Sequence, residues 1–441
     1  MRKAGWSRTS LGCLVTGLAF HLGLLTVLLV VWVAVGLPLG SHLLRRAEGA
    51  WFRDFLSEEE YRARYPVREH SPGAVRLDAL ARQVGTYLVV TPEDLKGASS
   101  RLERPEFKEV REVLGTLRQK QQDGVVRVPV SVARATESGA RELEAMEEVL
   151  LGGQDVDWKT PPSGDELTVS WVGLRNVQGL LFVRSLLADQ RGALSLRDRA
   201  LEASWRLNEG LWRRTDPVER LLAFVIGSDR NACLRRYRSV DGAWGKRLSG
   251  TRPLLALVDT YESEALAFCR RARPLVGIRD IDSLTSGKLP AVGPRGWLFR
   301  LATAPYLRLS VAGYSDALRG ETRRLREIDP CSLERDPYSD WVKKSQPAWN
   351  ILSRVAMPGL VGSWLSGRDA GLDDELTAAV LEARSVGSLR GERRRESAVC
   401  PDLVWVTRPA GAGAVRVEAE GAPTTGHADA RPRFSYTLAP S

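Results

Sequence analysis

The most apolar stretch of the chain lies close to its N-terminus. Residues 11–39 contain no Asp, Glu, Lys or Arg, and Leu and Val dominate them. These 29 residues exceed the roughly 20 that a helix needs to cross the hydrocarbon core of a bilayer. A helix is required there because every backbone N–H and C=O must be paired inside lipid, and Pro38 with Gly40 is expected to end it. The pattern therefore predicts a single-pass transmembrane helix in contact with membrane lipid, preceded by a short tail over residues 1–10.

The length of this stretch favours a retained signal anchor over a cleaved signal peptide. A signal peptide has an apolar region of about 7–15 residues followed by a cleavage site of small residues, and no such site follows cleanly here. Cys13 precedes the apolar run, whereas the lipid-modified Cys of a lipoprotein follows it, so Cys13 is interpreted as an ordinary apolar residue. His21 is interpreted as a neutral passenger in the helix, with a proton relay as the alternative.

The basic residues on the two sides of the anchor nearly balance, so the positive-inside rule alone does not orient it. Three precede the apolar run and three follow it within the counting window: Arg2, Lys3 and Arg8, and then Arg45, Arg46 and Arg53. A short tail before a first apolar helix usually stays in the cytoplasm. We therefore expect the rest of the chain to lie outside the cytoplasm. If the organism is bacterial, the helix is expected in the inner membrane and the body in the periplasm.

The residues that follow the anchor, 41–56, also carry apolar side chains at helical spacing. Leu43, Ala47, Trp51 and Phe55 recur every four residues, and arginines lie away from the centre of this stripe. The pattern predicts a second, amphipathic helix beside the membrane. Trp and Phe opposite Arg suit a helix that lies among lipid headgroups, and packing against the rest of the protein is the alternative.

Apolar positions at helical spacing continue over most of the chain as far as residue 389. The predicted helices cover residues 72–88, 105–122, 137–151, 167–189, 193–214, 217–237, 251–271, 296–328 and 372–389. Ser57 and Glu60 form a capping box for a short helix before them, and Pro305 is expected to kink or end its helix. Residues 167–214 are expected to form an αα-hairpin. No second copy matches at the period of about 34 residues that such hairpin repeats have, so we expect an irregular bundle.

Changes in composition divide this helical part. Residues 155–166 are rich in Pro, Gly and Asp and are interpreted as a linker. The linker separates a small mixed, mainly helical region at 57–154 from a helical body at 167–389. Residues 390–401 include the run RGERRRE and are interpreted as a solvated, charged linker, after which 402–441 forms the last unit.

Alternation of apolar and polar residues predicts a small sheet near the C-terminus. Residues 403–407 and 415–420 alternate around a loop rich in Gly and Ala and are expected to form a β-hairpin. Residues 434–438 can add a third strand. Residues 125–132 also alternate but contain Pro129, so they are interpreted as an edge strand or extended chain. The predicted fold is therefore mainly α, with a C-terminal β-hairpin or three-strand meander.

Composition and charge narrow the class of protein. Of the 441 residues, 43% are hydrophobic and 27% charged, which suits a packed core and excludes wholesale disorder. Lys and Arg total 64 against 54 Asp and Glu, a net charge of +10. Basic and acidic residues are interleaved and no nucleic-acid motif accompanies them, so nucleic acid is disfavoured as a partner. The expected partners are membrane lipid and an unknown protein. Residues 11–39 are expected to contact the lipid, and in one alternative residues 41–56 do so as well.

Few residues offer catalytic or cofactor chemistry. The chain lacks the phosphate-binding, dinucleotide-binding and zinc-binding motifs, and its four His residues are scattered. No cofactor and no metal is therefore expected. Carboxylates are the only candidates for acid–base catalysis, at Glu58, Glu59 and Glu60, at Glu262 and Glu264, and at Asp280 and Asp282. Glu262 and Glu264 point to different helical faces and are interpreted as a solvated surface pair, and the two Asp residues as helix caps.

Four cysteines lie beyond the anchor. Cys233 and Cys269 fall on successive predicted helices, which could bring them together, whereas Cys331 follows a helix end and Cys400 precedes the first C-terminal strand. A bridge between Cys331 and Cys400 would tie the sheet to the helical body and stabilise it by about 2–4 kcal/mol in an oxidising compartment. Four separate reduced thiols are the alternative.

These observations favour a non-catalytic, membrane-anchored helical protein whose body lies outside the cytoplasm and serves in protein interaction or envelope assembly. The alternative is a membrane-bound hydrolase that uses a carboxylate pair. A crevice with two converging carboxylates of raised pKa would support the hydrolase. An exposed apolar or Trp-lined groove without them would support binding.

Overall fold

The computed structural model describes residues 8–439 apart from 65, 67–68, 92–93, 95–103, 125, 154–155, 160–168, 215, 249, 275, 277–292, 333–346, 348, 387–390, 412 and 422–433. For residues 8–19, 64, 351–352 and 355–361 it describes the backbone. The described part is mainly α, with one long apolar N-terminal helix and a small C-terminal sheet. This confirms the predicted fold class.

The secondary structure is dominated by helices of up to 47 residues. The helices are α1 (Arg8–Asp54), α2 (Glu58–Arg64), α3 (Pro72–Gln83), α5 (Pro105–Gln119), α6 (Val130–Ser138), α7 (Ala140–Leu151), α8 (Trp171–Gln190), α9 (Leu194–Trp212), α10 (Pro217–Leu234), α11 (Ala243–Arg247), α12 (Arg252–Arg271), α14 (Pro294–Glu327) and α16 (Ile351–Val386). The strands are β1 (Arg393–Glu396), β2 (Val404–Pro409), β3 (Val415–Glu420) and β4 (Ser435–Leu438).

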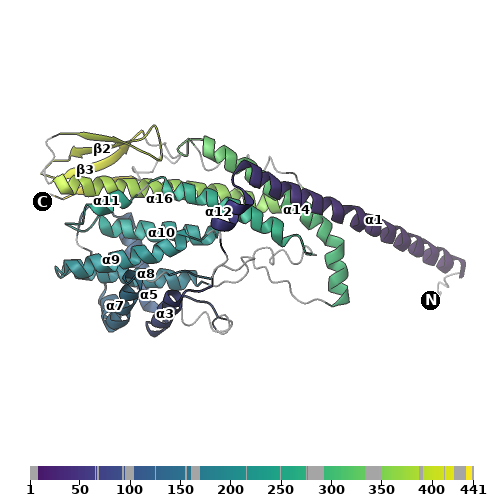
Figure 1. Ribbon diagram of the computed structural model, residues 1–441, viewed down its shortest axis with the longest axis horizontal. Helices are drawn as coiled ribbons and strands as arrows, with labels where there is room; N and C mark the ends of the chain where they lie inside the picture. The colour runs from purple at the N-terminus through teal and green to yellow at the C-terminus, as the bar shows by residue number, and fades with distance from the viewer. Residues whose placement is uncertain are drawn as a thin grey trace, which may run out of the picture.

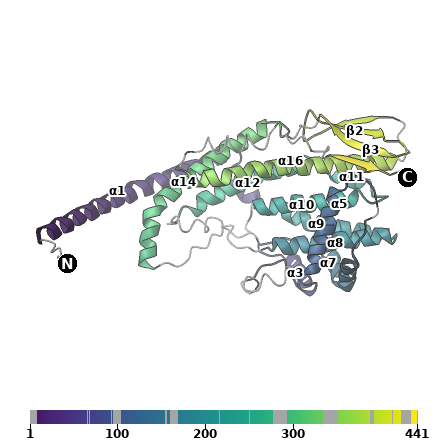
Figure 2. The same cartoon turned by 180° about the vertical axis from the view of Figure 1, so that it is seen from behind.

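The molecule is elongated, with α1 projecting from one end and the sheet at the other (Figures 1 and 2). α16 runs between the two ends and contacts α10, α12 and α14 as well as β2, β3 and β4. With 36 residues and ~1.5 Å of rise per residue, it is about 54 Å long. α3, α5, α7, α8 and α9 lie on the side of α10 that faces away from α16 (Figure 1).

α1 is a single helix from the apolar segment into the body, so the prediction that Pro38 and Gly40 end it is wrong. A proline inside a helix removes one backbone hydrogen bond and crowds the preceding turn. Beside the proline, the carbonyl of Leu37 accepts hydrogen bonds from Ser41 Oγ (2.7 Å) and from Arg308 Nη1 of α14 (3.4 Å), and Gly36 lies against Pro305 of α14. α14 thus packs closely against α1 on both sides of the proline.

The amphipathic stripe of residues 41–56 is buried against the body. Leu44, Ala47 and Trp51 are at most 2% exposed and pack with side chains of α12 and α14, while Arg45 and Arg46 face outward. Of the two interpretations of this stripe, the structure shows packing against the rest of the protein. The segment is the end of α1 rather than a separate helix.

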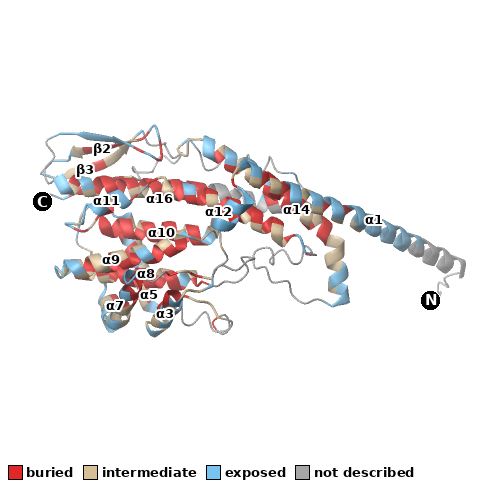
Figure 3. Cartoon of the chain, viewed as in Figure 1, coloured by how far each residue is buried: buried red, intermediate tan, exposed pale blue. Residues whose placement is uncertain are grey.

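Buried apolar side chains form two clusters. One joins the last turns of α1 to α12, α14, α16 and the sheet, and the other joins α3 to α5–α11. Figure 3 shows the buried residues concentrated along α8, α9, α10 and α16, whereas the free length of α1 is exposed. The second cluster includes Leu150, Val156, Trp158 and Val169. The core therefore continues through the described residues of the predicted linker at 155–166.

Two local predictions differ from the structure. α3 ends at Gln83 instead of residue 88, because Gly85 adopts a left-handed φ of 88°, a conformation that ends helices. Within 125–132 the alternation predicts an edge strand or extended chain, but α6 begins at Val130. Pro129 precedes the first helical residue, where a proline is tolerated, and the inward side chain of Val132 fixes the helix on the core.

α16 begins at Ile351, well before the predicted start at 372. Glycines in the first half of this helix lower its intrinsic propensity. They also allow close packing: a Cβ on Gly367 would lie 2.7 Å from Leu257 Cδ1 of α12. Tertiary packing therefore decides the helix where local sequence argues against it.

The C-terminal sheet has four antiparallel strands in the order β1-β2-β3-β4. The predicted hairpin is β2–β3, and the predicted third strand is β4. β1 comes from the charged run within 390–401, so 393–396 is solvated as predicted but is a strand of the sheet rather than a linker. All four residues of β1 are exposed, and Arg395 lies opposite Trp405 of β2. Charged side chains on an outer strand protect its edge from pairing with other chains.

One disulfide joins this sheet to the helical part. Cys331 and Cys400 are bonded with their Cα atoms 5.5 Å apart, which confirms the predicted pairing. Cys233 and Cys269 are buried free thiols, so they do not pair with one another.

Candidate functional site: the junction of anchor and body

The acidic residues at the start of α2 cap this helix and form an ion pair within it. Ser57 N donates to Glu60 Oε2 (2.6 Å) and Glu60 N donates to Ser57 Oγ (3.1 Å), which is the predicted capping box. Glu58 pairs with Arg62 at 2.8 Å on the exposed face. These carboxylates are in solvent at a helix N-terminus and do not converge on a crevice.

Glu262 and Glu264 of α12 both reach α14, so their interpretation as a solvated surface pair is wrong. Glu262 is 1% exposed, and its Oε1 lies 2.9 Å from Arg326 Nη2. Glu264 Oε1 accepts a hydrogen bond from the hydroxyl of Tyr314 (2.9 Å). Burial of the carboxyl group raises the pKa of Glu264 to about 7. Each carboxylate therefore joins two helices at a different place along α14.

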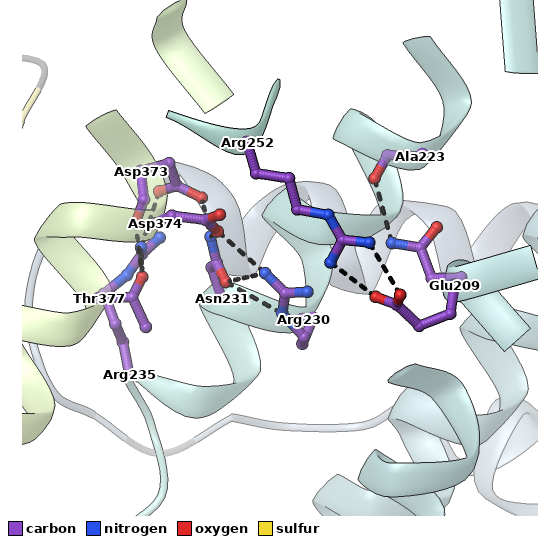
Figure 4. Close-up of polar contacts among 10 residues, drawn as sticks. Glu209, Ala223, Arg230, Asn231, Arg235, Arg252, Asp373, Asp374 and Thr377 are labelled. Atoms are coloured by element: carbon purple, nitrogen blue, oxygen red, sulfur yellow. Dashed lines mark hydrogen bonds and ion pairs between the residues drawn. The ribbon is translucent and has the colours of Figure 1, made fainter. Parts of the chain in front are cut away.

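A larger group of buried charges joins α10 to α16 (Figure 4). Arg230 Nη2 lies 2.9 Å from Asp374 Oδ1, and Arg235 Nη1 lies 2.7 Å from Asp373 Oδ1. Asn231 Nδ2 donates to both carboxylates, at 2.9 Å to Asp373 and 2.8 Å to Asp374. Burial raises the pKa of Asp374, and Arg230 opposes that shift. The group is a satisfied interhelical network.

Glu375, the next residue of α16, joins α16 to the sheet through hydrogen bonds. Glu375 Oε2 accepts from Ser397 Oγ (2.5 Å) and from Trp405 Nε1 (2.8 Å), and its Oε1 accepts from the backbone N–H of Ala398 (2.7 Å). Sequence analysis missed these acidic residues of α16. The sequence signal that could have found them is the run of three consecutive acidic residues in a helix. Three consecutive side chains point in different directions around the helix, so they cannot all face solvent when other elements surround it.

None of these carboxylates lines the cavity that the described residues form beside α5. A surface cavity of about 260 Å³ lies beside α5, where Glu109 and Glu112 line it with Lys120 and Arg127. Glu109 accepts a hydrogen bond from Ser131. Among the residues that the structure describes, no group of three His, Cys, Asp or Glu side chains could hold a metal ion. The candidates Asp280 and Asp282 lie outside the described residues.

The densest polar contacts around α1 occur where it enters the body. Trp51 Nε1 donates to Ser315 Oγ of α14 (2.9 Å). Glu48 lies 3.1 Å from Arg270 Nε of α12 and also contacts Arg273. We call this contact region of α1, α12 and α14 the anchor–body junction.

Two more side chains of α14 complete the anchor–body junction. Arg319 and Arg323 both contact Asp54, the second at 2.6 Å from Nη2 to Oδ2, and the Arg319 guanidinium lowers the pKa of Asp54. Nearer the apolar segment of α1, Arg308 Nη1 donates to Ser41 Oγ (2.7 Å) and Nη2 to the carbonyl of Arg273 (2.6 Å). α1 is thus held by apolar packing, ion pairs and hydrogen bonds along its last four turns.

The described residues contain one helix long and apolar enough to cross a membrane, and it is α1. The anchor–body junction therefore fixes the orientation of the body relative to that helix. Comparison of the chain with protein-family models, with curated proteins and with solved structures finds no match.

Proposed function

We propose that the chain is a membrane-anchored, non-catalytic protein whose helical body lies outside the cytoplasm and serves in protein interaction or envelope assembly. The observation that carries the proposal is the course of α1, which leaves the apolar segment and enters the core of the body without a break. A tether of this kind fixes the distance and direction of the body from the membrane. That constraint benefits a protein that must meet its partner at a defined place.

The cysteines support a location outside the cytoplasm, which is the periplasm if the organism is bacterial. Disulfides persist mainly in oxidising compartments, and Cys331–Cys400 spans 69 residues of chain. Burial raises the pKa of the free Cys269 thiol to about 12. That thiol stays protonated and does not compete for the bridge.

The placement of the carboxylates supports a role in binding rather than hydrolysis. A hydrolase with a carboxylate pair needs an acid and a base that face one substrate-sized space. Glu264 and Asp229, whose pKa values burial raises to about 7 and about 6, lie in helix–helix contacts. Neither lines the cavity beside α5.

Location is tested by treating spheroplasts or intact cells that express the full chain with protease. We expect the protein to stay in the membrane fraction after an alkaline carbonate wash and to lose the region beyond Leu56 to the protease. A body protected until the membrane is opened would overturn the outside location.

Function is tested by complementing a strain that lacks the protein with Glu264→Gln, which keeps the side-chain shape and an acceptor for Tyr314. We expect full complementation. In-cell photo-crosslinking from exposed positions such as Leu255 is expected to give one adduct of discrete mass. Loss of complementation at unchanged protein level and protease resistance would favour the membrane-bound hydrolase instead.

A further inference from the structure

Most described tryptophans are buried or half-buried, and three are exposed: Trp32, Trp297 and Trp349, at 40%, 50% and 51%. Trp32 belongs to the apolar part of α1, and Trp297 lies in the first turn of α14. Tryptophan concentrates at membrane–water interfaces, because its ring is apolar and its N–H seeks a polar partner. The location of Trp32 and Trp297 is therefore informative.

The start of α14 lies against α1 at the point where protein begins to cover that helix. Trp32 Nε1 donates to the carbonyl of Ala302 (2.9 Å). A Cβ on Gly36 would lie 2.7 Å from Cβ of Pro305, so the two backbones approach closely there. Further along, Trp51 contacts Ser315. From residue 302 onward α14 thus runs in the same direction as α1, and the residues before 302 come at the end of this contact nearest the apolar segment.

The length of the apolar segment places this contact at the membrane surface. Residues 20–32 of α1 are exposed, and Gly36 is the first buried position after them. Residues 12–31 alone supply the roughly 20 residues that a bilayer core requires. Trp32 then lies at the edge of the hydrocarbon, on the side of the body, and residues 294–304 of α14 lie at the same level.

The chemistry of residues 294–304 suits a lipid surface. Trp297 and Leu298 are 50% and 58% exposed, the segment carries Arg295 and Arg300, and it contains no acidic residue. α14 bends, and its first part turns away from α1 rather than following it (Figures 1 and 2). A short apolar and basic helix inclined to a membrane-spanning helix matches elements that lie in the headgroup layer.

We propose that residues 294–304 of α14 lie in the headgroup layer of the membrane that α1 crosses, with Trp297 and Leu298 inserted at its boundary with the acyl chains. Arg295 then lies among lipid phosphates. The bound surface is an anionic bilayer, and together with α1 it gives the body two points of contact with one membrane. The inference rests on the anchoring part of the proposed function and is independent of the interaction role.

The test uses the full chain in nanodiscs of phosphatidylcholine and phosphatidylglycerol. A nitroxide is attached to Leu298→Cys in a Cys13→Ser background, with the buried Cys233 and Cys269 unchanged. Collisions with oxygen, which partitions into lipid, are compared with collisions with a water-soluble nickel chelate. We expect oxygen to dominate at position 298.

Two control labels separate the possible failures. Leu25→Cys on α1 and Leu255→Cys on α12 start from side chains of similar exposure, 62% and 64%. We expect lipid contact at position 25 and water at 255. Lipid at 25 with water at 298, or shielding of 298 from both reagents by a second copy or another protein, would overturn the inference alone. Water at position 25 would overturn the anchoring as well.

A matched pair of variants tests the role of Trp297. With the label at 298, Trp297→Ser is expected to raise the collision rate with the nickel chelate several-fold. Trp349→Ser changes an equally exposed ring that contacts Gly313, further along α14 from the membrane, and is expected to leave the rate unchanged. An unchanged rate for Trp297→Ser, or equal effects of the two variants, would overturn insertion through Trp297.

Discussion

The anchor–body junction can be tested through Trp51, which is fully buried between α1, α12 and α14. Its ring lies 4.8 Å from that of Phe55, centroid to centroid, and its Nε1 donates to Ser315. Truncation of a buried Trp to Ala costs about 3–5 kcal/mol through lost contacts and the remaining cavity. Trp51→Phe keeps most of the ring and removes the hydrogen bond, which costs about 1 kcal/mol.

The measurement is amide hydrogen exchange of the full chain in detergent, read over residues 41–54. Local opening of this stretch sets its exchange rate. A loss of 3–5 kcal/mol in the opening free energy corresponds to roughly 10²- to 10⁴-fold faster exchange for Trp51→Ala. Trp51→Phe is expected to accelerate exchange by about fivefold.

The control is Trp349→Ala, which removes a half-exposed ring outside the junction and is expected to leave exchange over 41–54 unchanged. Unchanged exchange in Trp51→Ala would refute the reasoning, because the last turns of α1 would then be held without Trp51. An equal acceleration in α8 and α9 would also refute it, since the effect would be global unfolding rather than release of the junction.

Three further predictions concern the body. Cys331→Ser is expected to destabilise the body by about 2–4 kcal/mol, because the disulfide restricts the unfolded chain. Thermal unfolding with and without reductant checks this. Reductant should lower the unfolding midpoint of the unsubstituted protein and leave that of Cys331→Ser unchanged. Leu207→Asp puts a charge at a position with 0% exposure on α9 and should lower stability by several kcal/mol; an unchanged unfolding midpoint would contradict the inward position. In the folded protein Glu264 keeps its proton up to about pH 7, whereas an ordinary Glu carboxyl releases it near 4.5. Unfolding between these two pH values therefore releases a proton. The contribution of Glu264 to the free energy of unfolding falls by about 3 kcal/mol as the pH rises from 4.5 to 7 and is level above 7. Denaturant unfolding of Glu264→Gln across this pH range should show a smaller fall; an identical fall would contradict the assignment.

Local patterns sufficed to predict the features that depend on neighbours in sequence. Periodic apolar positions gave the hairpin of α8 and α9, and the capping box at Ser57 and Glu60 forms as expected. Each of these needs only residues near one another along the chain. For Cys331 and Cys400 the sequence left a bridge and four reduced thiols open, and the structure shows the bridge.

Features that depend on distant partners could not be predicted in this way. β1 consists of Arg and Glu because both its faces are exposed, so it has no alternation of apolar residues. α1 continues through Pro38, and the residue that binds beside the proline, Arg308, comes about 270 residues later in sequence. Asp373 and Asp374 are interpretable only once Arg230 of α10 and Arg235, the residue after α10, face them. In each case tertiary packing overrides what the local sequence favours.

The position of α16 between α10 and the sheet explains why charged side chains are buried along it. Three consecutive carboxylates hold α10 through Asp373 and Asp374, and the sheet through Glu375. An ion pair inside a protein gives up hydration and contributes little net stability, but it fixes geometry, since removal of one partner leaves an uncompensated charge. Glu48 and Asp54 play the same part at the anchor–body junction. Directional contacts therefore join α1 to α12 and α14, and α16 to α10 and the sheet, while apolar packing joins α16 to α12 and α14. Because charged contacts fix the geometry at both places, we expect the sheet to keep a defined position relative to α1.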